Sequence, residues 1–170
     1  AAGEALVVLA HQERRARYHL DKCESKAVLT PDGYALTAHK SIVPAGDQAD
    51  AFLVPAVLDG QIALFLLERA APGVRTRGYL TQDGSRAAEL EAERSPATLV
   101  TTEGLAALEL AVDTGSAAVC AEAVGVMDQV LAITADYLNQ RKQFGVAIAS
   151  FQALRHRLAD MKMQLELARS

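Results

Sequence analysis

The segment with the most evident chemistry runs from Arg141 to Gln152 and combines unlike side chains at fixed offsets around a predicted turn. Arg141 carries a permanent, forked cation that suits a pyrophosphate, and Gln152 carries an amide that both donates and accepts hydrogen bonds. Phe144 adds a flat apolar face. Together they would suit a dinucleotide. A helix C terminus stabilised by Arg141 and Lys142, with Phe144 buried, would explain the same residues structurally.

Other reactive side chains are more dispersed along the sequence. The four histidines, at positions 11, 19, 39 and 156, are far apart, and we interpret each as an ordinary imidazole with a local hydrogen bond. Glu109 and Asp113 lie four residues apart in a helical stretch, where two carboxylates could divide acid and base roles, although solvated carboxylates are commoner. We find no spacing typical of a metal site and predict no bound metal.

The sequence up to about Leu99 has the pattern of short strands and turns. Two aliphatic runs, 51–58 and 61–68, flank Asp59-Gly60, a dipeptide that favours a tight hairpin. Further turn signals occur at Pro31-Asp32-Gly33, Pro72-Gly73 and Asp83-Gly84. This spacing predicts a small antiparallel β-barrel or sandwich, whereas residues 1–20 are either a frayed lead-in or a strand followed by a basic loop.

The second part of the sequence predicts helices, so the fold class is α+β. Apolar residues recur at helical spacing over 102–140 without a proline, and at roughly 1.5 Å per residue this helix would extend about 55 Å. Such a length implies packing against another subunit. A turn at Gly145 and an N-cap at Ser150 then predict a second helix, antiparallel to the first. Its apolar stripe continues to Ser170, so we expect a piece of a longer protein.

Composition and charge limit the classes of partner. The net charge is −4, and the basic residues are dispersed apart from Arg14, Arg15 and Arg17, which argues against nucleic acid. Two distant cysteines, Cys23 and Cys120, fit reduced thiols and a cytoplasmic location. Acidic residues interrupt the apolar helix, so we expect a soluble protein without a membrane partner.

The stretch from Arg141 to Met161 resembles the signature of the acyl-CoA dehydrogenase family: R-x-Q-F-G, then F-Q, then L-A-D-M. The resemblance extends to nearly the whole chain, including Gly33-Tyr34, Lys40 and Pro72-Gly73-Val74. It implies that residues 1–98 form the family's middle β-barrel domain and that residues 99–170 form the first two helices of its C-terminal helical domain.

The resemblance also implies an activity and partners. Members of this family use FAD to remove two hydrogens from an acyl-CoA thioester, and they assemble as homo-tetramers or heteromers that pass electrons to an acceptor. By the same resemblance, Arg141 would bind the pyrophosphate of a neighbouring subunit's FAD. Gln143, Phe144 and Gln152 would contact its adenosine part. Asp113 matches a substrate-contacting position, and Gly115 stands where one class has its catalytic glutamate, so we expect the base beyond Ser170.

The chain departs from the family at positions that serve the flavin ring. The family's T-E-P-x-x-G-S-D loop corresponds to residues 12–19, where Glu13 alone is retained. The W-I-T strand reads Ile42-Val43-Pro44, and proline can donate neither a hydroxyl nor a backbone N–H. Two hypotheses follow: an FAD-dependent acyl-CoA dehydrogenase, or a non-catalytic partner subunit that completes a neighbour's FAD site. An unrelated barrel with an associating helical hairpin is a third.

Overall fold

The computed structural model describes residues 3–170, and contacts within it divide the chain into two compact units, residues 1–111 and 112–170. The long helix contributes to both units. Strand β7 continues across residues 98 and 99, where the sequence placed a domain boundary, and that boundary stays a prediction. Each unit is described by itself below.

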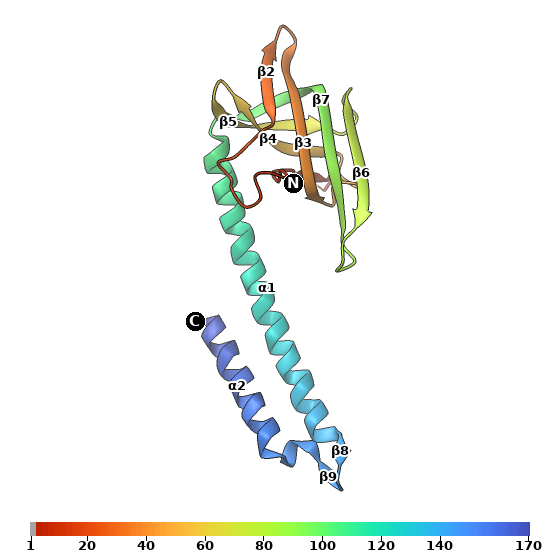
Figure 1. Cartoon of the computed structure of the whole chain (residues 1–170), viewed down its shortest axis with the longest axis vertical. Coiled ribbons are helices and arrows are strands. Elements are labelled where there is room, and N and C mark those ends of the chain that lie inside the picture. The colour runs from red at the N-terminus through yellow and green to blue at the C-terminus, as the bar shows by residue number, and fades with distance from the viewer. Residues whose placement is uncertain (1–2) are drawn as a thin grey trace. The chain divides into compact units, whose positions relative to one another are not determined.

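The first unit is a β-barrel with two additional strands (Figure 1). Its strands are β1 (Val7–Leu9), β2 (Lys26–Thr30), β3 (Gly33–Pro44), β4 (Ala51–Leu58), β5 (Gln61–Glu68), β6 (Val74–Leu80) and β7 (Arg86–Thr101). Strands β4, β2, β3, β7 and β5 follow one another around the barrel, and the pairing of β4 with β5 closes it. Closure leaves these strands without open edges, which confirms the predicted barrel.

Most strand pairings are antiparallel, as the short turns require. The exceptions are β1 with β4 and the single pair of β2 with β4, which are parallel. Asp59 and Gly60 join β4 to β5 with φ angles of 49° and 84°, the left-handed conformations that a two-residue hairpin turn needs. The predicted hairpin is therefore confirmed.

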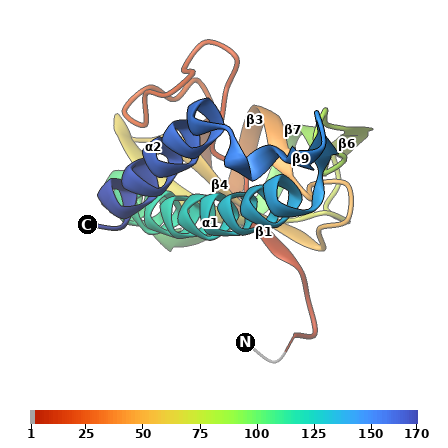
Figure 2. The same cartoon turned by 90° about the horizontal axis from the view of Figure 1, so that it is seen from below.

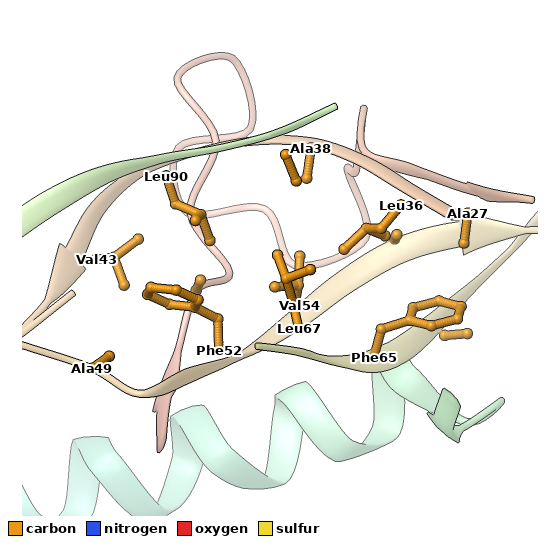
Figure 3. Packing of buried hydrophobic residues seen from close by; sticks show 14 residues of the cluster. Ala27, Leu36, Ala38, Val43, Ala49, Phe52, Val54, Phe65, Leu67 and Leu90 are labelled. Atoms are coloured by element: carbon orange, nitrogen blue, oxygen red, sulfur yellow. The ribbon is translucent and has the colours of Figure 1, made fainter. Parts of the chain in front are cut away.

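The barrel encloses an apolar core built from alternating residues of its strands. Phe52, Phe65 and Leu67 are fully buried on the β4–β5 hairpin, and Tyr34 meets Phe65 edge to face at 5.4 Å between ring centroids. Figure 3 shows Phe52, Phe65 and Leu67 converging with Leu36 of β3 and Leu90 of β7. Period-two alternation in the strands thus places one face of each strand inside the barrel.

Helix α1 (Gly104–Gln140) begins against the barrel, two residues after the predicted start. A Cβ on Gly104 would lie 2.7 Å from the carbonyl oxygen of Ile62, so only glycine allows this close approach to β5. Leu108, one turn further on, is buried. The start of α1 is therefore fixed to the barrel by packing.

The second unit contains the rest of α1, a two-residue hairpin of β8 (Lys142–Gln143) and β9 (Val146–Ala147), the 3₁₀ turn η1 (Ile148–Ser150) and α2 (Gln152–Arg169). Helix α2 runs back along α1 in both views (Figures 1 and 2). Arg169, at the end of α2, pairs with Asp128 in the middle of α1 at 3.1 Å. The predicted antiparallel helix pair is confirmed.

The predicted N-cap of the second helix was wrong. Ser150 ends the 3₁₀ turn, and its hydroxyl donates to the carbonyl oxygen of Ala147 at 2.8 Å instead of capping α2. Phe151 occupies the cap position and makes no side-chain capping bond. The serine hydroxyl therefore bonds within the 3₁₀ turn that precedes α2. Such local hydrogen bonds to the backbone are common for serine near helix starts.

Helix α1 exposes much of its apolar surface. Val119, Val126, Val130, Ile133 and Tyr137 are all about half exposed or more. By length and composition alone α1 could cross a membrane, which is a weak criterion for a single helix, and Glu109, Asp113, Glu122 and Asp128 lie along it. These apolar side chains form a surface that fits association with further helices.

Candidate functional site

The turn between the two helices holds the predicted dinucleotide-binding residues in a defined backbone conformation. Phe144 and Gly145 have φ angles of 54° and 80° and form the two-residue turn between β8 and β9. The N–H of Ile148 donates to the carbonyl oxygen of Arg141 at 2.8 Å, and the N–H of Arg141 donates to that of Tyr137 at 2.9 Å. We call residues 141–152 the hairpin tip.

The predicted binding residues of the hairpin tip are exposed. Arg141, Gln143 and Gln152 are exposed, and their side chains form no hydrogen bond or ion pair with any residue that the structure describes. Phe144 is 92% exposed, and its ring meets Phe151 edge to face at 6.2 Å between centroids. The interpretation of Phe144 as a buried structural residue is therefore wrong, because the turn carries the ring away from the helices.

This donor set fits the pyrophosphate and adenosine part of a dinucleotide. A free guanidinium can bind a phosphate with two parallel hydrogen bonds, and exposed amides can pair with an adenine or ribose edge. An exposed aromatic face suits stacking on a base. Asp113 is exposed on α1, and the structure does not bring it to the hairpin tip.

A second polar cluster lies in the barrel, and the sequence did not predict it. Glu13 is buried and accepts hydrogen bonds from Lys40 Nζ at 2.6 Å and from the Ser25 hydroxyl at 2.6 Å. The backbone N–H groups of Glu24 and Ser25 also donate to it, at 2.6 and 3.2 Å. Glu13 therefore ties both ends of the loop before β2 to strand β3. The signal available in the sequence was that Glu13 alone survives in an otherwise altered family loop.

Electrostatics in this cluster follow from the buried ion pair. Burial by itself would raise the pKa of Glu13, but hydrogen bonds from Lys40 and Ser25, the charge of Lys40 and the backbone N–H of Glu24 lower it to about 2. Burial and the nearby Lys40 charge lower the pKa of His11. Burial also raises the pKa of Cys23. At neutral pH the Glu13 carboxyl group is therefore ionised, whereas His11 and Cys23 are neutral.

A cleft of about 640 Å³ is lined by residues of this cluster, including Glu13 and Lys40. Arg14 and Arg15 of the loop form one side, and Glu89 and Glu91 of β7 form the other. Arg14 spans the cleft to Glu89 at 3.5 Å, and His39 of β3 lies 3.9 Å from Glu91. The cleft is large enough for a small ligand, and several of the charged side chains that line it are paired with one another.

The residues matched to the family's flavin-ring contacts do not fit an isoalloxazine ring. The carbonyl oxygen of Gln12 accepts a hydrogen bond from the N–H of Ser41, and Tyr18 is 92% exposed. Ile42 has a φ angle of 52° at a bulge in β3, a strained conformation for a β-branched residue. Pro44 has no N–H to donate. The hairpin tip fits its part of FAD, whereas the barrel does not supply the expected donors to the ring.

Comparison with known proteins identifies the family. Residues 102–170 match the model of the acyl-CoA dehydrogenase C-terminal domain. A probable acyl-CoA dehydrogenase of Bacillus subtilis, YngJ, is 32% identical in an alignment that covers 99% of this chain. The chain belongs to the acyl-CoA dehydrogenase family. Members of this family are oxidoreductases and flavoproteins.

Solved structures of the family share the fold of this chain. Butyryl-CoA dehydrogenase from Megasphaera elsdenii matches 97% of it with a TM-score of 0.88 and 29% identity. The ChsE4–ChsE5 complex from Mycobacterium tuberculosis matches 96% with a TM-score of 0.78 and 30% identity. The chain spans about half the length of these relatives: 48% of YngJ, 47% of the Megasphaera enzyme and 44% of the matched chain of the complex.

Proposed function

We propose that this chain belongs to an FAD-dependent acyl-CoA dehydrogenase, an enzyme that forms an α,β-double bond in an acyl-CoA thioester. In this proposal the hairpin tip binds the pyrophosphate and adenosine end of an FAD that a neighbouring subunit holds. The observation that carries it is the free guanidinium of Arg141 beside the exposed Gln143, Phe144 and Gln152, on a turn of defined conformation.

Each residue of the tip has a separate part in binding. Arg141 neutralises and orients the pyrophosphate, and its backbone is held by hydrogen bonds on both sides, which limits the entropy lost on binding. Phe144 offers its ring to the adenosine part, and the amides of Gln143 and Gln152 bind polar edges. Bound FAD would supply the acceptor for the hydride of the β-carbon. We expect the base for the α-proton outside these 170 residues, because Gly115 stands at the alternative position.

Association of subunits is part of this proposal. The exposed apolar side chains of α1 would be covered in an oligomer, and a tip that points outward can serve a neighbouring molecule. An acyl-CoA substrate and an electron acceptor are the other expected partners. Both a homo-tetramer and a heteromer fit these surfaces.

A second function is favoured by the barrel. Pro44, the exposed Tyr18 and the charged cleft spanned by Arg14 and Glu89 suit a partner subunit that completes a neighbour's FAD site without holding the flavin ring itself. One of the structural relatives comes from a complex of two different proteins, ChsE4 and ChsE5. In this version, the chain contributes the tip and an unlike homologue contributes the ring site.

The two functions differ in the visible spectrum of the purified protein. A homomeric enzyme isolated with its complete chain should be yellow, and acyl-CoA added without oxygen should bleach it. A partner subunit should be colourless alone and should acquire flavin only when mixed with an unlike homologue. A protein that remains colourless in every mixture, although folded by circular dichroism, would exclude both.

A further inference from the structure

The sulfur of Cys23 lies beside the buried ion pair of the barrel. Cys23 Sγ is 3.9 Å from Lys40 Nζ and 3.6 Å from Glu13 Oε1, while Lys40 Nζ is 2.6 Å from the same carboxylate oxygen. Its thiol also faces the carbonyl oxygens of Pro55 at 3.4 Å and Ser25 at 3.7 Å. Cysteine, lysine and a carboxylate therefore meet in one cluster, although 17 residues separate Cys23 from Lys40.

The surroundings of Cys23 differ from those of Cys120. Both thiols are free, but Cys23 is half-buried in this cluster, whereas Cys120 is exposed on α1, a helix that contains no lysine. An oxidised sulfur at Cys120 would find no amine nucleophile on its own helix. An oxidised sulfur at Cys23 would have a nitrogen nucleophile held next to it, and such proximity strongly favours reaction within the cluster.

We propose that Cys23 and Lys40 form a reversible sulfur–nitrogen cross-link when the protein meets a peroxide. In the first step the thiol sulfur attacks hydrogen peroxide, an S–O bond forms, the O–O bond breaks and water leaves, which gives a sulfenic acid. The sulfur is oxidised and the peroxide is reduced.

In the second step the lysine replaces the hydroxyl group. The ammonium of Lys40 passes one proton to Glu13, and the free amine then attacks the sulfur. An S–N bond forms, the S–O bond breaks, and the departing oxygen leaves as water with a second proton from the nitrogen. This is the condensation that joins sulfenic acids to backbone nitrogens, here with a side-chain amine. Two thiols of an added reductant restore the cysteine and the amine and become a disulfide.

The link changes the loop that carries Arg14 and Arg15. It joins the loop before β2 covalently to β3 beneath the cleft, and it removes the charge that Lys40 shares with Glu13. Glu13, which has taken up a proton from Lys40, loses its ionic partner but keeps the hydrogen bonds from the backbone N–H groups of Glu24 and Ser25. Oxidation would thus fix the loop while altering the charge below it. Because burial raises the pKa of Cys23, the sulfur is a thiol at neutral pH and oxidises slowly.

Peptide mapping tests this proposal directly. The purified full chain is incubated with hydrogen peroxide, the remaining thiols are alkylated, and the protein is digested with trypsin and analysed by mass spectrometry. The cross-link joins peptide 23–26 to peptide 27–69, because a linked Lys40 is not cleaved. The expected product contains both peptides, has lost two hydrogens, and disappears after treatment with dithiothreitol.

Matched controls separate this product from general oxidation. Cys120 should progress to sulfinic and sulfonic acids in the same digest, without any linked peptide. Lys40→Arg keeps a cation beside Glu13 but removes the amine, so Cys23 should then also reach the sulfinic acid. If Cys23 of the unmodified sequence is recovered as a free thiol or a sulfinic acid with Lys40 cleaved normally, the proposal is overturned, even if the Lys40→Arg variant does not fold.

Discussion

The barrel and the helix pair use their polar residues in opposite ways. In the barrel, Lys40 is fully buried and paired with Glu13, so neither charge is available to bind another molecule. Among the described residues from 112 onward, the buried hydrophobic side chains are Leu138 and Leu165, and the tip leaves Arg141 free. A polar group that the fold satisfies supports structure, whereas a positioned polar group that it leaves free is suited to bind another molecule.

The largest effect should come from breaking the buried ion pair. Lys40→Met leaves the Glu13 carboxylate buried without its cation, which costs about 3–5 kcal/mol. Lys162→Met breaks an exposed pair of similar length with Glu166 and should destabilise the protein far less, because water screens both charges. Urea unfolding of both variants measures the difference. Equal losses would show that burial does not distinguish the two pairs.

The same pair predicts how the barrel responds to acid. The pKa of Glu13 is lowered from 4.5 to about 2 in the folded barrel, so its contribution is complete above the unfolded value and is lost as the pH falls toward 2. Stability of the barrel should therefore decline between about pH 4.5 and 2. Denaturant titrations over this range test the prediction, and the decline attributable to Glu13 should vanish in Glu13→Gln.

In the helix pair, a smaller loss should follow from Leu165→Ala. Leu165 is 1% exposed, and removing it creates a cavity that costs about 2–3 kcal/mol in a region with few other buried side chains. Hydrogen exchange should show lower protection in α2, with unchanged protection in β4 and β5. Leu167→Ala, at an exposed position of the same helix, is the control and should change little. Equal loss of protection in the barrel would contradict the division into two units.

The smallest effect concerns the bulge in β3. Ile42 is 55% exposed and has a φ angle of 52°, so Ile42→Gly should relieve about 1 kcal/mol of backbone strain, offset in part by the freedom that glycine adds to the unfolded chain. A net gain of about 0.5 kcal/mol is expected in urea unfolding. Ile42→Ala keeps the strained Cβ and should not gain. A gain of the same size in both variants would show that it comes from removing the isoleucine side chain and not from relieving backbone strain.

Local patterns predicted much of the fold from the sequence. Asp59-Gly60 predicted its hairpin because only a few residue types accept two left-handed φ angles in succession. The helical spacing of apolar residues predicted α1 and α2. The glycine between these two stretches, Gly145, predicted the turn. Ser150 was misassigned as an N-cap, because a serine near a helix start can equally bond within a 3₁₀ turn.

Long-range polar contacts were not predictable in the same way. Glu13 and Lys40 are 27 residues apart. The alternation of β3 places Lys40 on the same face as Leu36 and Ala38, but no local pattern pairs this lysine with Glu13. Closure of the barrel brings them together. The outward direction of Phe144 also depended on the conformation of its turn, since apolar character alone favoured burial.

Retention of FAD by an Arg141→Ala variant tests the central claim most directly. Arg141 has no side-chain partner among residues 3–170, so its removal should leave thermal stability within about 0.5 kcal/mol of the original. Affinity of the assembled protein for FAD, measured by flavin fluorescence, should fall at least about tenfold, which corresponds to about 1.4 kcal/mol. Lys142→Ala, the adjacent exposed cation, is the matched control and should retain FAD. Unchanged FAD affinity in Arg141→Ala, in an assembly that binds FAD, would contradict the role given to the hairpin tip.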